Sequence, residues 1–305
     1  MPELKNRNLV SIEDFNTEEK SYILDLAEGF EKETTQKILE EKVVATLFFE
    51  PSTRTRLSFE SAASRLGAKV IGFTDSASSS VKKGETLKDT ILTVSNYSDL
   101  IVMRHPLEGS ARYASEVSPV PIINAGDGAH QHPTQTLLDM YSIRKTQGRL
   151  DDIQIAFVGD LKYGRTVHSL VFAMCDFGAT FHLVSPVELK LPSYVKQKIK
   201  DLNLKYYQYT DLQEAIEEVD ILYMTRIQRE RFSDPIEYER VKNAYILNND
   251  MLGSAKDNLK ILHPLPRVNE IDEDVDSNPM AYYFQQAENG VFVRQALLAS
   301  ILGVV

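Results

Sequence analysis

The chain has 305 residues, more than one average domain holds, and its 43% hydrophobic and 26% charged residues are ordinary for a soluble globular protein. The formal net charge of −10 argues against a broad nucleic-acid-binding surface, so anionic ligands would have to be attracted by a few focused cations. No apolar run is long enough to cross a bilayer, the N-terminus has no signal-peptide pattern, and the single Cys175 excludes an intrachain disulfide, so we expect a two-lobed cytoplasmic protein.

Short apolar runs alternate with helical patterns along the chain, which predicts an α/β fold whose two lobes each hold a parallel sheet flanked by helices. In the first half, Asn16 and Glu19 have the spacing of a capping box at a helix start. A polar stretch rich in serine covers residues 74–84. The predicted elements of this half are strands at residues 43–49, 101–103 and 121–124, and helices at residues 52–66 and from 132 towards 148.

The second half continues the alternation, with predicted strands at residues 153–158, 180–184, 205–208, 220–224, 244–247 and 259–262. The last predicted helix covers residues 289–302, and we expect it to pack back on the first lobe. The lobe boundary is predicted near His132. The two expected domains are therefore residues 1–131 together with 289–305, and residues 132–288.

A run of five polar donors, Ser52-Thr53-Arg54-Thr55-Arg56, follows the first predicted strand and a turn at Pro51. Amides at a helix start point outward and carry the positive end of the helix dipole, so they bind phosphate. Hydroxyl groups and a forked guanidinium complete such a pocket. A capped helix with solvated arginines is the simpler explanation for any one of these residues, but the whole run favours an anion site.

Further polar groups follow the next predicted strands. Arg104 comes directly after the strand at residues 101–103, where α/β folds bind their ligands, although a lone arginine is more often a surface residue. The segment His130-Gln131-His132-Pro133-Thr134-Gln135 enters a helix with proline at its first position. Its H-x-H spacing could indicate a metal site, but no cysteine or carboxylate cluster supplies the remaining ligands, so we expect no metal. Neutral donors suit instead the polarisation of a carbonyl group.

Residues 159–166, Gly-Asp-Leu-Lys-Tyr-Gly-Arg-Thr, nearly match a nucleotide-binding P-loop because they follow a strand and open a helix. Arg165 replaces the lysine of that motif, and Asp160 adds a negative charge. The segment also lacks the glycine spacing of a dinucleotide site. The match is therefore weak, but a nucleotide-hydrolysing enzyme remains one alternative, and it predicts magnesium-dependent ATP binding.

Two later segments complete the set of polar motifs. Thr225-Arg226-Ile227-Gln228 stands at the end of the strand predicted at residues 220–224. His263-Pro264-Leu265-Pro266-Arg267 holds two prolines, which leave carbonyl oxygens without competing amide donors. Such carbonyls can accept hydrogen bonds from an amide NH₂ group, although a proline-stiffened turn is the simpler explanation.

In this order, from Glu50 to Arg267, the motifs resemble those of the aspartate/ornithine transcarbamoylase family over nearly the whole chain. The resemblance is to the aspartate branch. Pro264 stands where the ornithine branch typically has a cysteine, and Lys83 lies in a loop where that branch has no lysine. The resemblance also implies a cis peptide bond between Leu265 and Pro266.

The resemblance implies a role for individual residues. The carbamoyl phosphate site would consist of Ser52, Thr53, Arg54, Thr55, Arg104, His132, Gln135, Pro264 and Leu265. The aspartate site would consist of Lys83, Arg165, Arg226 and Gln228, with Lys82 as an alternative to Lys83. The loop that carries Ser80 and Lys83 would reach the site of a neighbouring subunit, and Glu50 would pair with Arg165 and Arg231 when the lobes close.

The reaction implied is transfer of the carbamoyl group of carbamoyl phosphate to the α-amine of L-aspartate, which yields N-carbamoyl-L-aspartate and phosphate for pyrimidine biosynthesis. Arg54 would grip the phosphate, and Thr55, Arg104 and His132 would stabilise the developing oxyanion. This chemistry requires no covalent nucleophile, cofactor or metal. The expected partners are the two substrates, further copies of the chain in a homotrimer and, as in some members, a separate zinc-containing regulatory chain; no nucleic acid or membrane is expected. A non-catalytic scaffold of the same fold is the second alternative.

Overall fold

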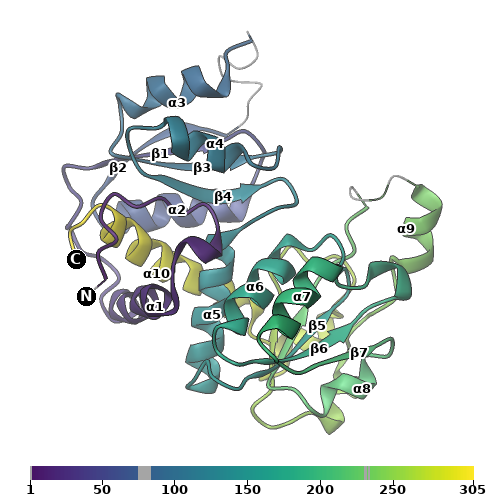
Figure 1. Cartoon of the computed structure of the whole chain (residues 1–305). Helices are drawn as coiled ribbons and strands as arrows, with labels where there is room; N and C mark the ends of the chain where they lie inside the picture. The colour runs from purple at the N-terminus through teal and green to yellow at the C-terminus, as the bar shows by residue number, and fades with distance from the viewer. Residues whose placement is uncertain (1, 75–83, 230–231, 233) are drawn as a thin grey trace. The chain divides into compact units, whose positions relative to one another are not determined.

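The computed structural model describes residues 2–74, 84–229, 232 and 234–305, and the chain divides into two compact units. Unit 1 comprises Met1–Tyr141 and Ala287–Val305, and unit 2 comprises Ser142–Gln286. Each unit holds one sheet of parallel strands flanked by helices, which confirms the predicted fold class (Figure 1). The division lies after Tyr141, whereas the sequence pattern places the boundary at His132.

The sheet of unit 1 has the strand order β2-β1-β3-β4. Its strands are β1 (Val43–Phe48), β2 (Lys69–Phe73), β3 (Leu100–His105) and β4 (Ile122–Asp127). The helical elements in and around this unit are η1 (Ile12–Asp14), α1 (Thr17–Lys32), α2 (Thr53–Arg65), α3 (Leu87–Ser95), α4 (Ser110–Val117) and α5 (Pro133–Gln147), together with most of α10 (Tyr283–Ile301). The capping box predicted at the start of α1 is present, because Asn16 and Glu19 bond each other's backbone N–H groups.

Helices cover both faces of the unit 1 sheet. Figure 1 shows α3 and α4 on one face, and α1, α2 and α10 on the other. Under α3 and α4, side chains of β1 and β3 such as Leu47 and Met103 form a fully buried cluster with Ile91. Burial on both faces explains why these strands are continuous apolar runs in the sequence.

The C-terminal helix α10 packs on unit 1, as the sequence predicts. Arg294 Nη1 donates a hydrogen bond to Ser58 Oγ at 2.9 Å, and Gln295 Nε2 donates to the Thr34 carbonyl at 2.9 Å. Gly290 lies inside this helix because a Cβ there would come within 2.3 Å of Arg294 Nη1 and 3.0 Å of Leu138. The close approach accounts for a glycine in a helix interior, where it otherwise costs about 1 kcal/mol.

The sheet of unit 2 has the strand order β7-β6-β5-β8-β9. Its strands are β5 (Gln154–Val158), β6 (Thr180–Val184), β7 (Tyr206–Tyr209), β8 (Ile221–Met224) and β9 (Lys260–Leu262). The connecting elements are α6 (Arg165–Cys175), η4 (Val187–Leu189), α7 (Ser193–Asp201), α8 (Gln213–Ile216), α9 (Pro235–Val241), η6 (Asn249–Ser254) and η7 (Glu273–Ser277). Stacked rings of Phe157 and Phe181 fill one side of the central strands, and α8, η6 and η7 contribute to the buried cluster on the other.

The structure corrects three expectations. Residues 244–247 do not form a strand of the sheet, since only Leu247 makes an isolated bridge, to Ile271. The last helix begins at Tyr283 and not at residue 289. Strand β2 is not among the predicted strands, because its side chains are mostly exposed at the sheet edge and include a lysine and a glycine.

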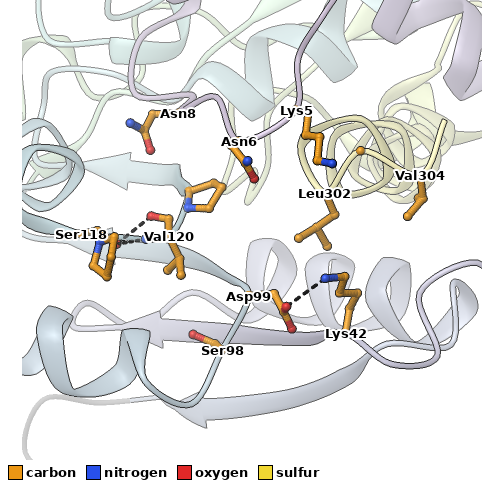
Figure 2. A pocket seen from close by; sticks show the side chains of 13 residues that line it. Lys5, Asn6, Asn8, Lys42, Ser98, Asp99, Ser118, Val120, Leu302 and Val304 are labelled. Atoms are coloured by element: carbon orange, nitrogen blue, oxygen red, sulfur yellow. Dashed lines mark hydrogen bonds and ion pairs between the residues drawn. The ribbon is translucent and has the colours of Figure 1, made fainter.

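A hollow of about 630 Å³ lies at the amino edge of the unit 1 sheet. Lys42, Asp99 and Pro121, which line it, directly precede β1, β3 and β4. Figure 2 shows the Lys42 ammonium turned towards the Asp99 carboxylate, with Nζ and Oδ1 3.0 Å apart. The hollow is therefore at the edge opposite to the one that carries the predicted substrate residues. No helix of the described residues is long and apolar enough to span a membrane.

Gly159, directly after β5, is expected to be essential for the local backbone. Its φ is +113°, and a Cβ would lie 2.3 Å from the Thr225 carbonyl oxygen. We expect Gly159→Ala to lower the free energy of unfolding by at least about 1–3 kcal/mol, the cost of a strained backbone residue. Urea denaturation measures the loss. Gly253→Ala is the control, since no atom lies within 4 Å of its added Cβ. Equal midpoints for the two variants would contradict the prediction.

Candidate active site

Both sheets have a switch point, where successive connections leave a strand in opposite directions. In unit 1, β1 lies between β2 and β3; in unit 2, β5 lies between β6 and β8. Crevices at the carboxyl ends of such strand pairs are where open α/β sheets bind ligands. The segments after β1 and β3, and after β5 and β8, are therefore the first places to look for a site. Arg54, Arg165 and Arg226 fall in these segments, whereas Arg104, expected just after a strand at residues 101–103, lies within β3 near its carboxyl end.

The unit 1 switch point brings the end of β1 against the end of β3. Phe48 pairs with Arg104 in the sheet register, and the Phe49 N–H donates to the Arg104 carbonyl at 2.9 Å. The Arg104 side chain, 14% exposed, donates from Nε to Glu50 Oε2 at 3.0 Å. Glu50 thus holds the guanidinium at the carboxyl edge of the sheet, beside the start of α2.

The start of α2 has the features of an anion site. Ser52 is the N-cap with an extended backbone, and its hydroxyl makes no capping hydrogen bond. Thr53 and Arg54 are exposed, whereas the Thr55 side chain is buried. Arg56 turns away to Glu60, with Nη1 3.1 and 3.2 Å from the two carboxylate oxygens. Arg56 is therefore engaged along α2, and Arg54 is the exposed arginine of this run at the helix start.

A buried carboxylate shapes the loop that carries His132. Asp127, 1% exposed, accepts hydrogen bonds from Asn124 Nδ2 at 2.9 Å, the Gln131 N–H at 3.1 Å and the Gly109 N–H at 3.0 Å. Burial alone would raise the pKa of Asp127, but hydrogen bonds from His130 and Asn124 hold it below its ordinary value. The loop then enters α5 at Pro133, as predicted, with His132 buried at the helix start.

His130 contacts the carboxylate that shapes this loop. Its ring is half-exposed, and Nδ1 lies 3.4 Å from Asp127 Oδ2. This hydrogen bond raises the pKa of His130 above its ordinary value. Among the residues that the structure describes, no group of three or more His, Cys, Asp or Glu side chains is arranged to hold a metal ion.

Gln135 is oriented by a second buried carboxylate. Its Nε2 donates to Asp139 Oδ1 at 2.8 Å, one helical turn along α5, and Asp139 is completely buried. A carboxylate only accepts, so the amide must turn its NH₂ to Asp139 and direct its carbonyl oxygen elsewhere. That oxygen is an acceptor suited to an NH₂ group of a ligand.

Arg294, on helix α10, is a buried cation on which the charge of Asp139 acts. The guanidinium is buried, lies 4.9 Å from the centre of the Phe59 ring and donates to Ser58. Burial lowers the pKa of Arg294 to about 10, while the charge of Asp139 acts in the opposite direction. Arg294 therefore links α10 to α2 through its hydrogen bond to Ser58, and its charge interacts with that of Asp139 on α5.

The unit 2 switch point holds the loop after β5 against Thr225. The Thr225 hydroxyl donates to the Val158 carbonyl at 2.8 Å and accepts from the Asp160 N–H at 3.1 Å. Arg165 begins α6, and Arg226 and Gln228 follow β8, the neighbouring strand. These three predicted aspartate-binding residues thus share the carboxyl edge of one sheet.

The same loop cannot act as a P-loop. Asp160 is 1% exposed, and its Oδ1 accepts the N–H groups of Lys162 at 3.2 Å and Tyr163 at 2.9 Å. A phosphate would need these amides, and the carboxylate already occupies them. The geometry therefore disagrees with the nucleotide-hydrolysing alternative.

Pro264 and Leu265 follow β9, next to β8, and the Leu265–Pro266 peptide bond is cis, as the resemblance implies. Both residues are half-buried. Ser80, Lys82, Lys83 and Arg231 lie outside the described residues.

Sequence reasoning did not single out Asp127, Asp139 or Arg294. Asp139 could have been found from its four-residue spacing to Gln135 on one helix face. Arg294 could have been found as a lone cation in an apolar helix.

Comparisons with known proteins agree with this architecture. The family model "Aspartate/ornithine carbamoyltransferase, carbamoyl-P binding domain" matches residues 7–145, and the model of the family's "Asp/Orn binding domain" matches residues 151–301. The chain belongs to the aspartate/ornithine carbamoyltransferase family. This assignment confirms the resemblance inferred from the motifs.

Family members similar to this chain include several aspartate enzymes. The aspartate carbamoyltransferase catalytic subunit of Phocaeicola vulgatus is 64% identical over 302 residues, which cover 99% of this chain and 96% of that protein. The catalytic subunit of the M. jannaschii aspartate transcarbamoylase is 54% identical, with a TM-score of 0.89 and 96% of each chain covered. The Trypanosoma cruzi aspartate transcarbamoylase, solved in complex with carbamoyl phosphate and aspartate, is 37% identical, with a TM-score of 0.94 and 98% of each chain covered.

The Asp139–Arg294 pair gives a testable expectation for stability. Asp139→Asn removes the negative charge that acts on the buried Arg294, and loss of one of two coupled buried charges typically costs about 3–5 kcal/mol. We expect a correspondingly lower urea midpoint, and the double variant Asp139→Asn/Arg294→Met should regain part of the loss. Glu28→Gln, which breaks an exposed pair with Lys32, is the control and should cost less than about 1 kcal/mol. An Asp139→Asn midpoint equal to that of the control would contradict a coupled buried pair.

Proposed function

We propose that the chain is the catalytic subunit of an aspartate carbamoyltransferase. It transfers the carbamoyl group of carbamoyl phosphate to the α-amine of L-aspartate and releases N-carbamoyl-L-aspartate and phosphate. The observation that carries the proposal is the anion-binding start of α2 beside Arg104 at the unit 1 switch point. The names of relatives up to 64% identical over 99% of the chain support the same activity.

In this proposal unit 1 supplies most of the carbamoyl phosphate site, and unit 2 supplies Arg165, Arg226 and Gln228 of the aspartate site. The carbamoyl phosphate domain is residues 1–131 with 289–305, and the aspartate domain is residues 132–288; the family models that match residues 7–145 and 151–301 support this order. Carbamoyl phosphate is bound by Ser52, Thr53, Arg54, Thr55, Arg104, His132 and Gln135, with the carbonyls of Pro264 and Leu265 accepting from its amide. Aspartate is bound by Lys83, Arg165, Arg226 and Gln228.

The chemistry follows from the charges of these groups. The uncharged α-amine of aspartate attacks the carbonyl carbon, and the carbonyl oxygen gains negative charge that Thr55, Arg104 and His132 stabilise. The C–O bond to phosphate then breaks, and the departing phosphate, gripped by Arg54, accepts the amine proton. The two arginines of the aspartate site, Arg165 and Arg226, match the two carboxylates of aspartate and would repel the cationic side chain of ornithine.

The rival functions are less well supported. The Asp160 carboxylate accepts hydrogen bonds from the backbone N–H groups that a nucleotide phosphate would need. A non-catalytic scaffold would have lost site residues, yet each expected residue is present in the sequence. No observation on the described residues favours either alternative.

The proposed assembly is a homotrimer in the cytoplasm. The loop with Ser80 and Lys83 completes the site of a neighbouring subunit, and Glu50 exchanges Arg104 for Arg165 and Arg231 when substrates are bound. A separate zinc-containing regulatory chain is a further proposed partner. The single cysteine agrees with a reducing compartment, and the net charge of −10 agrees with the absence of nucleic acid among the partners.

Replacing Arg54 tests the phosphate site. Arg54→Ala removes a charge-assisted donor from the leaving phosphate, so turnover should fall roughly 10²–10³-fold, as after loss of an oxyanion donor. Arg56→Ala, two residues on, is the matched control, because Arg56 is engaged by Glu60. Steady-state kinetics with both substrates measures the effect. A normal turnover with only a raised KM in Arg54→Ala would oppose a role in the chemical step.

Mixing two inactive variants tests the shared site. Lys83→Ala lacks the cation of the loop, and Arg54→Ala lacks the phosphate donor. When they are unfolded and reassembled together, mixed trimers should contain some sites with an intact loop from one chain and an intact phosphate pocket from another. Partial activity should therefore return. Mixed trimers that form but stay as inactive as their parents would contradict sharing.

A further inference from the structure

A buried histidine lies behind the two carbonyls that follow β9. His263 is 2% exposed, and its Nδ1 lies 2.8 Å from the Leu265 backbone nitrogen. The Leu265 N–H donates, so Nδ1 must be unprotonated and the ring proton must be on Nε2. Nε2 lies 2.7 Å from Glu270 Oε1 and donates to it. Burial lowers the pKa of His263, and the charges of Arg267 and Arg226 act in the same direction, so the ring stays neutral despite the carboxylate.

Glu270 closes the other end of the same loop. Its second oxygen, Oε2, accepts the N–H groups of Val268 and Asn269, each at 3.1 Å. Burial alone would raise the pKa of Glu270, but the hydrogen bond from His263 holds it below its ordinary value. The two side chains therefore form a brace that runs from the Leu265 amide through the imidazole and the carboxylate to the amides of residues 268 and 269.

The brace acts where the backbone is unfavourable. Leu265 has a φ of +53°, in the left-handed region that is unfavourable for a residue with a Cβ. The prolines on either side of Leu265 have no N–H groups. Among residues 264–266 the Leu265 N–H is therefore the only backbone donor through which the turn can be held. The hydrogen bond to His263 thus fixes the peptide plane whose oxygen belongs to Pro264.

We propose that His263 and Glu270 are positioning residues, which aim the carbonyls of Pro264 and Leu265 at the amide of the carbamoyl group. The inference rests on the proposed function, in which these carbonyls bind that amide. Neither side chain touches the substrate. Because the brace acts on the carbamoyl end only, it should affect ligands that carry the amide and spare ligands that consist of phosphate alone.

Glu270→Gln separates this role from simple stabilisation. The amide can still accept from Nε2 of His263, but it then presents NH₂ to the N–H groups of Val268 and Asn269, which breaks that end of the brace. We expect the affinity for phosphonoacetamide, which keeps the amide and resists hydrolysis, to fall by roughly three- to tenfold, as after loss of a hydrogen bond. The affinity for inorganic phosphate should not change. Glu273→Gln, an exposed carboxylate in η7, is the control.

A second pair of variants tests the histidine itself. In His263→Asn the Oδ1 atom can replace Nδ1 as acceptor for the Leu265 amide, whereas His263→Leu removes the acceptor. Phosphonoacetamide should bind His263→Asn more tightly than His263→Leu. Equal binding by these two, equal losses for phosphate and phosphonoacetamide in Glu270→Gln, or a Glu270→Gln affinity equal to the control would each overturn the proposal. A wild-type chain that binds no phosphonoacetamide and transfers no carbamoyl group would instead overturn the proposed function.

Discussion

The parallel arrangement of both sheets places the described candidate site residues at the carboxyl edges of the two sheets. Parallel strands end on the same side, and only at a switch point do the following segments separate and leave a crevice. In unit 1 that point lies between β1 and β3, and in unit 2 between β5 and β8. The start of α2 and Arg104 therefore share the carboxyl edge of the unit 1 sheet, and Arg165 and Arg226 lie at the carboxyl edge of the unit 2 sheet. The chain has 44 acidic and 34 basic residues, so an anion has to be attracted by a local group of cations and not by the whole surface. The strand order brings the predicted cations to the carboxyl edges of the sheets.

Four segments that carry predicted site residues are each held by a buried carboxylate. Asp127 fixes the loop to His132, Asp139 orients Gln135, and Asp160 organises the loop before Arg165. Glu270 does the same for the turn after β9. A buried carboxylate is costly unless its oxygens are satisfied, and these accept backbone and side-chain hydrogen bonds that are stronger than neutral ones. These buried acidic residues hold the loops and helices that carry predicted site residues. Part of the chain's negative charge is therefore structural.

Much of this could be predicted from sequence, and the failures have physical causes. Strands buried on both faces, such as β1 and β5, are apolar runs and were predicted, whereas the exposed edge strand β2 has no such signal. Residues 244–247 are apolar because Leu247 joins the core of unit 2, not because they lie in the sheet. The predicted site residues could be found in the sequence because they lie in polar motifs next to the ends of apolar strands. The buried carboxylates were missed, because an acidic residue reads as surface unless its hydrogen-bond partners, distant in sequence, are known.

Carboxylates in these positions do more than neutralise charge, since they accept hydrogen bonds and never donate them when ionised. A neighbouring group with two possible orientations is therefore left with one. Gln135 must turn its NH₂ to Asp139, and His263 must keep its proton on Nε2, towards Glu270. As a result the Gln135 carbonyl oxygen and the Nδ1 lone pair of His263 are both committed as acceptors. An asparagine or glutamine in place of either acid could satisfy the same space but would leave both orientations open. The acids thus fix the acceptor atoms of Gln135 and His263 within each unit.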